Sequence, residues 1–287
     1  MKKTILTFIS LGLLASCTEN MEHEIPEMSD KTISINANII SSRAPILDEN
    51  GSGNFTDGDK IYLTAEGNTS GKWFSREFAV GVDKLSWDDI QMDDDTEAVF
   101  SAFYPVPENA NQGKFDFNAS TSEFSDILMA KQIEANVDEK TTLNLSFVHV
   151  MHKLEIKYVS KNGDYSEENL NNITTSCTAL TTCEVDMKKS TVNTSQSSSG
   201  TYNTKAGKTV DFIIVPQNTD EVSLTINLGN GKTVNKQLNE ICQNSQTLES
   251  GKKLTITFDI SINGVEIIAS QINGWDSQGT FEDEIIV

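Results

Sequence analysis

Alternating apolar and polar residues predict β-strands along most of this chain. Between Lys31 and Ile40, isoleucine or alanine stands at every second position, with serine or asparagine in between. A period of two residues is typical of a strand with one buried face. The same alternation is cleanest in three later stretches, 143–147, 222–228 and 254–260.

Further strands are expected wherever Val, Ile, Thr and aromatic residues gather between turn residues. Gly229-Asn230-Gly231 predicts a tight hairpin, and a helical period is confined to a short stretch near residues 167–172. The Ser-, Thr- and Asn-rich stretch 190–205 predicts an exposed loop. We therefore predict an all-β fold built from sandwiches. The remaining expected strands cover residues 60–64, 72–80, 98–104, 127–133, 154–159, 210–215, 233–238 and 265–272.

The phase of the alternation changes between residues 143 and 158. Apolar residues hold odd positions from Leu143 to Met151 and even positions from Leu154 to Tyr158. A slip of one residue turns every side chain to the other face of a sheet. The sequence therefore predicts a bulge or a change of sheet near His152.

The first residues of the chain are typical of an export signal. Lys2 and Lys3 precede an apolar run, residues 5–14, that is too short to cross a bilayer. The following Leu14-Ala-Ser-Cys17 resembles the bacterial lipobox, whose cysteine is acylated and becomes the first mature residue. We expect residues 1–16 to be a lipoprotein signal peptide and Cys17 to carry lipid. An ordinary secretory signal with an incidental cysteine is the alternative.

The rest of the chain divides into a tether and two expected domains. Residues 17–30 are polar and acidic and contain a proline, which predicts a flexible tether. The remainder is long enough for two domains, which we place at 31–139 and 140–287. No later stretch approaches the roughly 20 apolar residues of a membrane span, so lipid is the expected anchor.

The charge and the cysteines narrow the range of partners. A formal net charge of −20 disfavours binding to nucleic acid and to anionic lipid headgroups. Cys177, Cys183 and Cys242 do not have the dense, even spacing of a disulfide framework. Cys177 and Cys183 are placed to close a small loop or to lie buried as small apolar residues, and we favour the second reading.

No constellation for catalysis stands out, so we predict no enzyme, no cofactor and no metal. His149 and His152 are three apart on a strand and therefore point to opposite faces, which favours structural roles. The stretch 48–59 imitates a calcium loop in its oxygen-bearing positions, but position 12 is aspartate and no helix is expected on either side. Turn formation accounts for it better. The run Asp93-Asp94-Asp95 predicts a solvated turn.

Several segments taken together resemble the fimbrillin-like proteins, the type V pilin superfamily of Bacteroides-type bacteria. The most specific is Phe147-x-His149-x-x-x-Lys153-Leu154. They occur in the family's order over nearly all the mature chain; the others are Phe55-Thr-Asp-Gly-Asp-Lys-Ile61, Phe100-Ser-Ala-Phe-Tyr-Pro105, Asp126-Ile-Leu-Met-Ala130, Ile213-Ile-Val-Pro-Gln217, Leu248-Glu-Ser-Gly-Lys252 and Ile272-Asn-Gly-Trp275.

This resemblance implies a fold, a location and an assembly mechanism. The fold is two tandem transthyretin-like β-sandwich domains, and the location is the cell outer membrane, the cell surface and the fimbrium. In the pilins, an Arg-specific protease removes the first strand of the N-terminal domain. A strand from a neighbouring subunit then fills the groove by β-augmentation.

The sequence contains the parts that this mechanism needs. Arg43 and Arg76 are the only arginines, and Arg43-Ala44 follows the first predicted strand directly. Cleavage there would release the lipid, the tether and one strand together. Burying the three isoleucines of that strand is worth on the order of 5–9 kcal/mol, at about 1.5–3 kcal/mol each. An ordinary surface arginine is the alternative.

The C-terminal end leaves two alternatives open. After Trp275, the apolar residues Phe281, Ile285, Ile286 and Val287 form either a short donor strand or the last edge strand of the domain. We expect a fimbrial structural subunit, either pilin or tip and accessory adhesin, with other fimbrial subunits as partners by strand exchange. A non-polymerising surface lipoprotein that binds a host or bacterial surface ligand, glycan or protein, is the second hypothesis.

Overall fold

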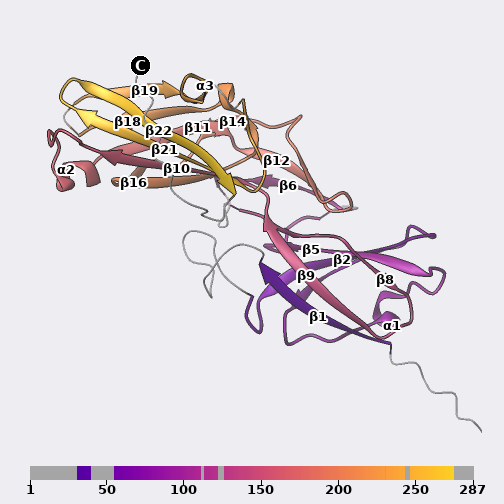
Figure 1. The fold of residues 1–287 in the computed structure, drawn as a ribbon. Helices are drawn as coiled ribbons and strands as arrows, with labels where there is room; N and C mark the ends of the chain where they lie inside the picture. The colour runs from indigo at the N-terminus through magenta and orange to yellow at the C-terminus, as the bar shows by residue number, and fades with distance from the viewer. Residues whose placement is uncertain are drawn as a thin grey trace, which may run out of the picture.

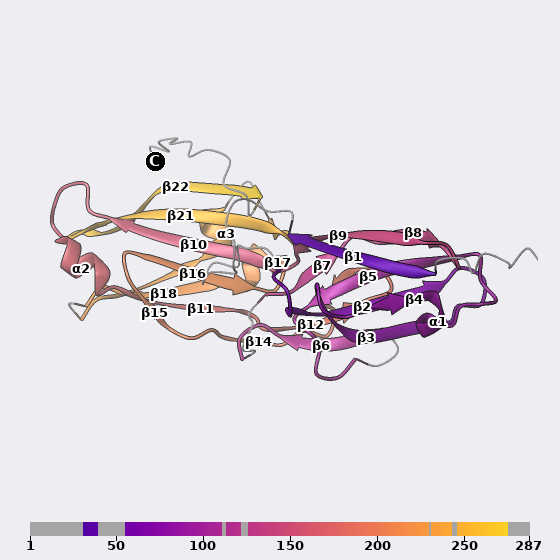
Figure 2. The ribbon, with the colours of Figure 1, turned by 90° about the horizontal axis from the view of Figure 1, so that it is seen from below.

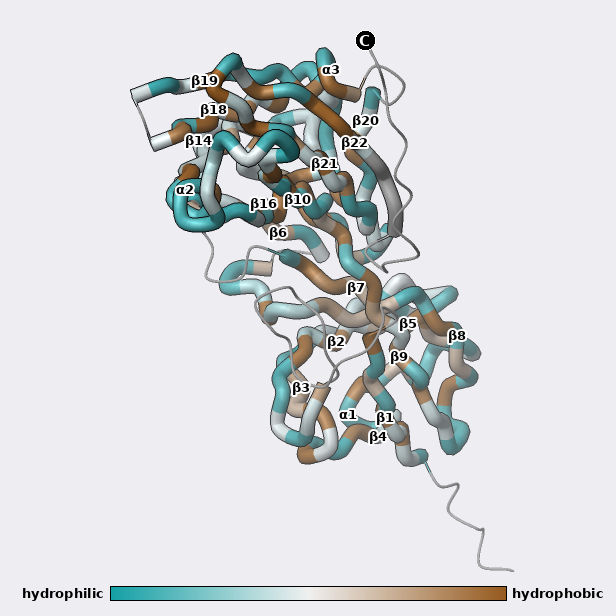
Figure 3. Tube along the Cα trace, turned by 60° about the vertical axis from the view of Figure 1, so that its left-hand side comes forward, coloured by the Kyte–Doolittle hydropathy of each residue, from teal (hydrophilic) through white to brown (hydrophobic). Residues whose placement is uncertain are grey.

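The computed structural model describes residues 31–39, 55–110, 113–121, 126–229, 231–242 and 246–274. These residues form two lobes of β-structure, which lie end to end in Figures 1 and 2. Each lobe has its own buried apolar cluster. Apolar residues recur along the strands of both lobes (Figure 3), as the alternation in the sequence requires.

The first lobe is built on one eight-stranded sheet, with strand order β3-β2-β5-β7-β9-β1-β4 and β8 paired with β5. The helix α1 (Trp87–Ile90) follows β4 and buries Trp87 and Ile90. The strands are β1 (Thr32–Ile39), β2 (Lys60–Gly67), β3 (Trp73–Ala79), β4 (Leu85–Ser86), β5 (Glu97–Tyr104), β7 (Leu128–Ala130), β8 (Ile133–Asn136) and β9 (Thr141–His149).

The second lobe contains two larger sheets whose apolar residues share one buried cluster. One sheet has the order β16-β10-β21-β22, and the other has the order β14-β11-β18-β19 with β15 paired with β11. The strands are β10 (His152–Val159), β11 (Thr174–Leu180), β14 (Ser199–Thr201), β15 (Lys205–Ala206), β16 (Thr209–Ile214), β18 (Ser223–Asn227), β19 (Thr233–Gln237), β21 (Lys252–Ser261) and β22 (Gly264–Gly274). The smaller elements are α2 (Glu167–Asn171), η1 (Thr219–Glu221), α3 (Leu238–Ile241) and the pair β17 (Gln217–Asn218) with β20 (Thr247–Leu248).

A third, small sheet joins distant parts of the chain. Its order is β13-β12-β6, formed by β13 (Thr191–Asn193), β12 (Thr182–Asp186) and β6 (Lys114–Asn118). In sequence, β6 lies between β5 and β7 of the first lobe. Its side chains Phe115 and Phe117 nevertheless belong to the apolar cluster of the second lobe. The segment between β5 and β7 therefore crosses from one lobe to the other and back.

The turn between β12 and β13 contacts the first lobe. The Lys188 Nζ lies 2.5 Å from Glu66 Oε1 on β2 and 5.0 Å from the ring centroid of Trp73 on β3. The Gln132 side chain donates a 2.6 Å hydrogen bond to the Lys188 carbonyl. These contacts hold the β12–β6 sheet against the first lobe.

The structure confirms the all-β prediction and explains the change of phase. β9 ends at His149 in the sheet of the first lobe, and β10 begins at His152 in a sheet of the second lobe. The change of phase is therefore a change of sheet. The predicted hairpin after β18 and the short helix near residue 167 are also confirmed.

Two sequence predictions are wrong. The stretch 190–205, predicted as a loop, contributes β13, β14 and the start of β15, although its side chains are largely exposed. The strand predicted over residues 127–133 is two strands, β7 and β8, which pair with different parts of β5. The polar composition of residues 190–205 contains no strand signal, because strands whose side chains are largely exposed need no alternation of apolar and polar residues.

The predicted solvated turn at residues 93–95 is also wrong for Asp95, which is only 6% exposed. Its carboxylate accepts hydrogen bonds from the Ser70 hydroxyl, the Ser70 N–H and the Thr69 N–H, and these hold the pKa of Asp95 below its ordinary value. A Cβ on Gly67 would come within 2.0 Å of that carboxylate. Asp95 therefore fixes the β2–β3 turn, and only glycine fits beside it.

The boundary between residues 139 and 140 stays a prediction. β9, which that boundary assigns to the second domain, pairs with β1 and β7 of the first lobe. This pairing favours a division after His149. Within the part of the chain that the structure describes, no helix is long and apolar enough to span a membrane.

Candidate strand-exchange site

β1 is the strand that the assembly hypothesis concerns, and it lies at an unusual place in its sheet. It runs parallel to β9 over seven residue pairs, from Ile33 opposite Thr141 to Ile39 opposite Phe147. On its other side, its pairing within the described residues is limited to Thr32 and Ile33, opposite the two-residue strand β4. Figures 1 and 2 show β1 alongside β9 on the outside of the first lobe. For most of its length, β1 is thus an edge strand.

The side chains of β1 alternate between the core and solvent. Ile33 and Ile39 are 3% and 8% exposed, Ala37 is buried and Ile35 is half-buried. They lie beside the fully buried side chains of β9 on the same face of the sheet, Leu143, Leu145 and Phe147, and share one apolar cluster with them. The opposite face of β1 is polar and exposed, and Asn36 donates a 3.0 Å hydrogen bond to the Asn144 side chain.

The two ends of β1 are held differently. Before its first residue, Lys31 Nζ lies 2.9 Å from Asp138 and 3.2 Å from Asp88, and the hydrogen bond to Asp138 is the largest cause that raises the pKa of Lys31. The Lys31 carbonyl also accepts from the Trp87 N–H at 3.1 Å. These contacts fix the register at the start of the strand. At the other end, Ile39 leads into residues 40–54, which lie outside the described residues.

β1 can leave this sheet without breaking the pairings among β3, β2, β5, β7 and β9. The other pairings of the sheet in the described residues are antiparallel, and parallel pairing is slightly less stable per residue. The antiparallel framework β3-β2-β5-β7-β9 does not depend on β1. Loss of β1 would leave a groove beside β9, flanked by Leu143, Leu145 and Phe147 and floored by the apolar cluster of the first lobe, with unpaired backbone groups along its wall.

The predicted site residues themselves fall outside the described part of the chain. These are Cys17, Arg43, Ala44, Phe281, Ile285, Ile286 and Val287, and their roles stay predictions. The other arginine is described. Arg76 lies within β3, opposite Leu63 of β2, and its guanidinium donates a 2.7 Å hydrogen bond to the Lys84 carbonyl. A protease that needs an extended, accessible segment finds Arg76 in a paired strand.

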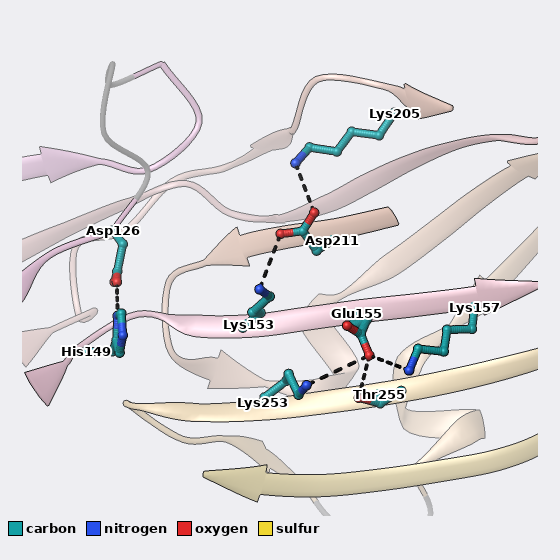
Figure 4. Close-up of polar contacts among 9 residues, drawn as sticks. All are labelled: Asp126, His149, Lys153, Glu155, Lys157, Lys205, Asp211, Lys253 and Thr255. Carbon is teal, nitrogen blue, oxygen red and sulfur yellow. Dashed lines mark hydrogen bonds and ion pairs between the residues drawn. The ribbon is translucent and has the colours of Figure 1, made fainter. Parts of the chain in front are cut away.

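The two histidines of the Phe147–Leu154 motif have structural surroundings. His149 pairs with Asp126 at the end of β9 (Figure 4). His152 donates from Nδ1 to the Glu249 carbonyl at 2.9 Å, and its buried Nε2 has no partner in the described residues. No group of three or more His, Cys, Asp or Glu in the described ranges is arranged to hold a metal ion. The motif marks the passage of the chain from one lobe to the other.

Burial of His152 predicts a pH dependence of stability. Desolvation lowers the pKa of His152 from 6.5 to about 4, against a raising effect of the Glu249 hydrogen bond. Between these values the unfolded chain binds a proton that the folded chain does not, so stability falls as the pH falls from 6.5 to 4. The loss amounts to about 3 kcal/mol at 1.36 kcal/mol per pKa unit.

We expect His152→Leu to lose this part of the pH dependence. Urea unfolding at pH 7 and pH 4 gives the free energy of unfolding of the wild type and of the variant. From pH 7 to pH 4, the wild type should lose about 3 kcal/mol more of this free energy than the variant. His23→Gln, in the predicted tether, is the matched control and should follow the wild type. An equal difference between wild type and variant at both pH values would contradict the assignment.

The outer face of β10 carries a network of opposite charges (Figure 4). Glu155 accepts from Thr255 at 3.2 Å and lies 3.0 Å from Lys157 and 3.9 Å from Lys253. Asp211 lies between Lys153 and Lys205, at 3.8 and 3.6 Å. These contacts tie β10 to β21 and β16 and serve the sheet itself.

The cysteines are buried and free, as predicted. Cys177, Cys183 and Cys242 form no disulfide. Burial raises the pKa of Cys177 and Cys183 to about 12, so both remain protonated thiols in the core.

The arrangement of β1, β9 and the second lobe can now be set beside known proteins. A family model described as fimbrillin-like matches residues 42–275. The chain belongs to the fimbrillin-like family. The matched stretch covers most of the chain: it begins just after β1 and includes the rest of the first lobe and the second lobe. Membership in the fimbrillin-like family supports a surface adhesion or fimbrial subunit role, structural rather than catalytic, at the cell surface.

Solved structures show the same fold at low sequence identity. A candidate cell adhesion protein of Bacteroides uniformis is 19% identical with a TM-score of 0.60, over 76% of this chain and 92% of that one. A candidate cell adhesion protein of Bacteroides ovatus is also 19% identical with a TM-score of 0.59, over 87% and 99%. One of Parabacteroides distasonis is 8% identical with a TM-score of 0.52, over 88% and 100%. No protein of curated function matches the chain.

Sequence reasoning found β1 but not its neighbours. The alternation from Ile33 to Ile39 predicts a strand and its buried face, and both are observed. It carries no information about the parallel partner β9, more than a hundred residues away, or about the ion pairs of Lys31. Leu143, Leu145 and Phe147 alternate with polar residues in the same way as the apolar residues of β1. This shared pattern is the sequence signal that relates the two strands.

Proposed function

We propose that this fimbrillin-like protein is a structural subunit of a surface fimbria that assembles by strand exchange. In this proposal lipid on Cys17 anchors the chain in the outer membrane, and cleavage between Arg43 and Ala44 frees β1. A strand from another fimbrial subunit then takes the place of β1 beside β9. The observation that carries the proposal is the position of β1, which within the described residues pairs along its length with β9 and on its other side with β4 at Thr32 and Ile33.

The energetics support exchange rather than simple loss of β1. Before cleavage β1 is part of the same chain, so its pairing with β9 is intramolecular and stable. After cleavage the same strand is a separate peptide, and its free concentration relative to its dissociation constant decides what fraction of the grooves it occupies. A donor strand that is tethered to a neighbouring subunit replaces it without leaving the apolar floor exposed to water.

The pattern of β1 also defines what the groove accepts. The incoming strand needs apolar side chains at the positions of Ile33, Ile35 and Ile39. At the position of Ala37 it needs a small side chain, because a larger one would overpack a site that now holds a single methyl group. The residues between them face solvent and can be polar. This alternation with one small position is the specificity that we propose.

Treatment of the purified chain with an Arg-specific protease tests the proposal. We expect one cut, after Arg43, followed by a ladder of multimers that resists detergent on electrophoresis. Arg43→Lys should abolish both the cut and the ladder, whereas the matched control Arg76→Lys should change neither.

A cut after Arg43 without a ladder would exclude polymerisation of this subunit with itself. In that case, addition of a mixture of other fimbrial subunits separates a tip or anchor role from the non-polymerising lipoprotein. The tip role and the anchor role predict a stable complex that forms after the cut and not before it, whereas the non-polymerising lipoprotein predicts none.

A further inference from the structure

Within the described residues, the strand β6 is paired on one side only in the small sheet of the second lobe. It is the terminal strand of the order β13-β12-β6. The hydrogen bonds from Ala119 N–H to the Thr181 carbonyl and from Met187 N–H to the Gly113 carbonyl set the pattern of the ladder with β12. In such a ladder the backbone groups of alternate residues point away from the partner strand. The N–H and C=O groups of Lys114, Asp116 and Asn118 therefore point outward from the edge.

A cleft of about 580 Å³ lies along this edge. Residues 115–118 of β6 form one wall, and the segment Pro105–Asn109 forms the other, with Thr121 and Ile127 completing the lining. Pro105 and Pro107 have no N–H to donate, so this facing segment is unsuited to completing the ladder itself. The volume is within the range of sites that bind a ligand.

The charge of the cleft is negative. Glu108 and Asp116 are exposed, and neither carboxylate forms an ion pair within the described residues. Lys114, on the same strand, lies 2.8 Å from Glu184 and 3.6 Å from Asp186, so its charge is already compensated. Asp116 stands directly opposite Glu184 in the ladder with β12, and Glu184 is itself paired with Lys114. Asp116 therefore keeps a charge that a cation of the ligand can pair with.

We propose that the edge of β6 is a docking site for an extended, cationic peptide segment of a partner protein. The peptide adds as a strand to β6, with lysine or arginine at alternate positions beside Asp116 and apolar residues between them toward Phe115, Phe117 and Ile127. A cationic partner is favoured over a second copy of this chain, because the chain has a net charge of −20. The site is separate from the groove of β1, which lies in another sheet.

Binding of a designed peptide to the uncut mature chain tests this proposal while β1 still fills its own groove. The probe is a seven-residue peptide of alternating lysine and valine, and the matched probe has glutamate in place of lysine. We expect binding of the lysine peptide alone, weakening as salt rises, with slower hydrogen exchange at the amides of Lys114, Asp116 and Asn118.

Two variants separate the edge from general attraction between charges. Asp116→Lys should weaken binding about tenfold, since it replaces an attraction by a repulsion of similar size. Asp116→Pro removes an N–H that the β12 ladder does not use, so the chain should fold and the slower exchange should be lost. Glu221→Lys, an exposed charge reversal on η1, is the matched control and should bind like the wild type.

Absence of binding by the lysine peptide would overturn the proposal. Equal binding of the two peptides would do the same, as would binding that neither Asp116 variant changes. Circular dichroism of each variant establishes that it is folded before its affinity is compared.

Discussion

A chain that begins at Ala44 is expected to be less stable in its first lobe by about 4–7 kcal/mol than the chain that keeps β1. Ile33 and Ile39 are almost fully buried and Ile35 is half-buried, and full burial of an isoleucine side chain is worth about 1.5–3 kcal/mol. Because Ile35 is only half-buried, this range is lower than the one for three fully buried isoleucines, which is about 5–9 kcal/mol. The backbone pairing with β9 is lost as well.

A synthetic peptide of the β1 sequence, Thr32–Ile39, should restore part of this stability. At a concentration of 100 times its dissociation constant it would return about 2.7 kcal/mol. Urea unfolding followed by the fluorescence of Trp87, which is 1% exposed in the first lobe, measures both the loss and the rescue. A peptide with Asp at the positions of Ile33 and Ile39 is the control. Equal stability with and without β1 would contradict the groove as we describe it.

The substitution Ile33→Asp is expected to free β1 without any cleavage. It places a carboxylate at a position that is 3% exposed, at a cost of several kcal/mol, because Ile33 belongs to the buried apolar cluster of the first lobe. In an Arg43→Lys background, which removes the predicted cut, this variant should form multimers slowly where its parent forms none.

Ser34→Asp provides the matched control for this gain of assembly. Ser34 is the next residue along β1 and is exposed, so the same charge there should be nearly neutral. Electrophoresis in detergent without heating compares the two variants. If both assemble alike, charge rather than release of β1 is responsible. If neither assembles although Ile33→Asp exposes β9 to hydrogen exchange, an open groove is not sufficient for assembly.

The sequence predicts strands best where a strand is regular and one face is deeply buried. β9, β18 and β21 have buried residues at every second position, and each is predicted within a few residues of its bounds. β11 is missed because its buried residues Thr175, Cys177 and Ala179 are as small and mild as the exposed ones beside them. Periodicity has no contrast to report there.

β6 is not among the predicted strands, although its sequence has an alternating pattern. Phe115 and Phe117 alternate with Lys114, Asp116 and Asn118, which is the pattern of a short strand. A local pattern cannot show which lobe this strand joins. The phenylalanines of β6 pack in the core of the second lobe, although the neighbouring strands β5 and β7 belong to the first. The same holds for Asp95, whose burial depends on Ser70 and Thr69 in a distant turn.

The candidate site was predicted as a set of sequence signals, and the structure supplies its geometry. Alternation identifies the strand and Arg43 marks a place to cut, but neither specifies that β1 pairs with β9 along its length and with β4 at only two residues. That asymmetry depends on the path of the whole sheet. In our proposal, it is also what makes β1 replaceable.

The mature N-terminus of the chain in assembled surface material tests this account most directly. Mass spectrometry of N-terminal peptides from purified fimbriae distinguishes lipid-modified Cys17 from free Ala44. The account predicts Ala44 in every assembled subunit, with Cys17 confined to unassembled precursor. Assembled subunits that begin at Cys17 and retain Thr32–Ile39 would contradict it.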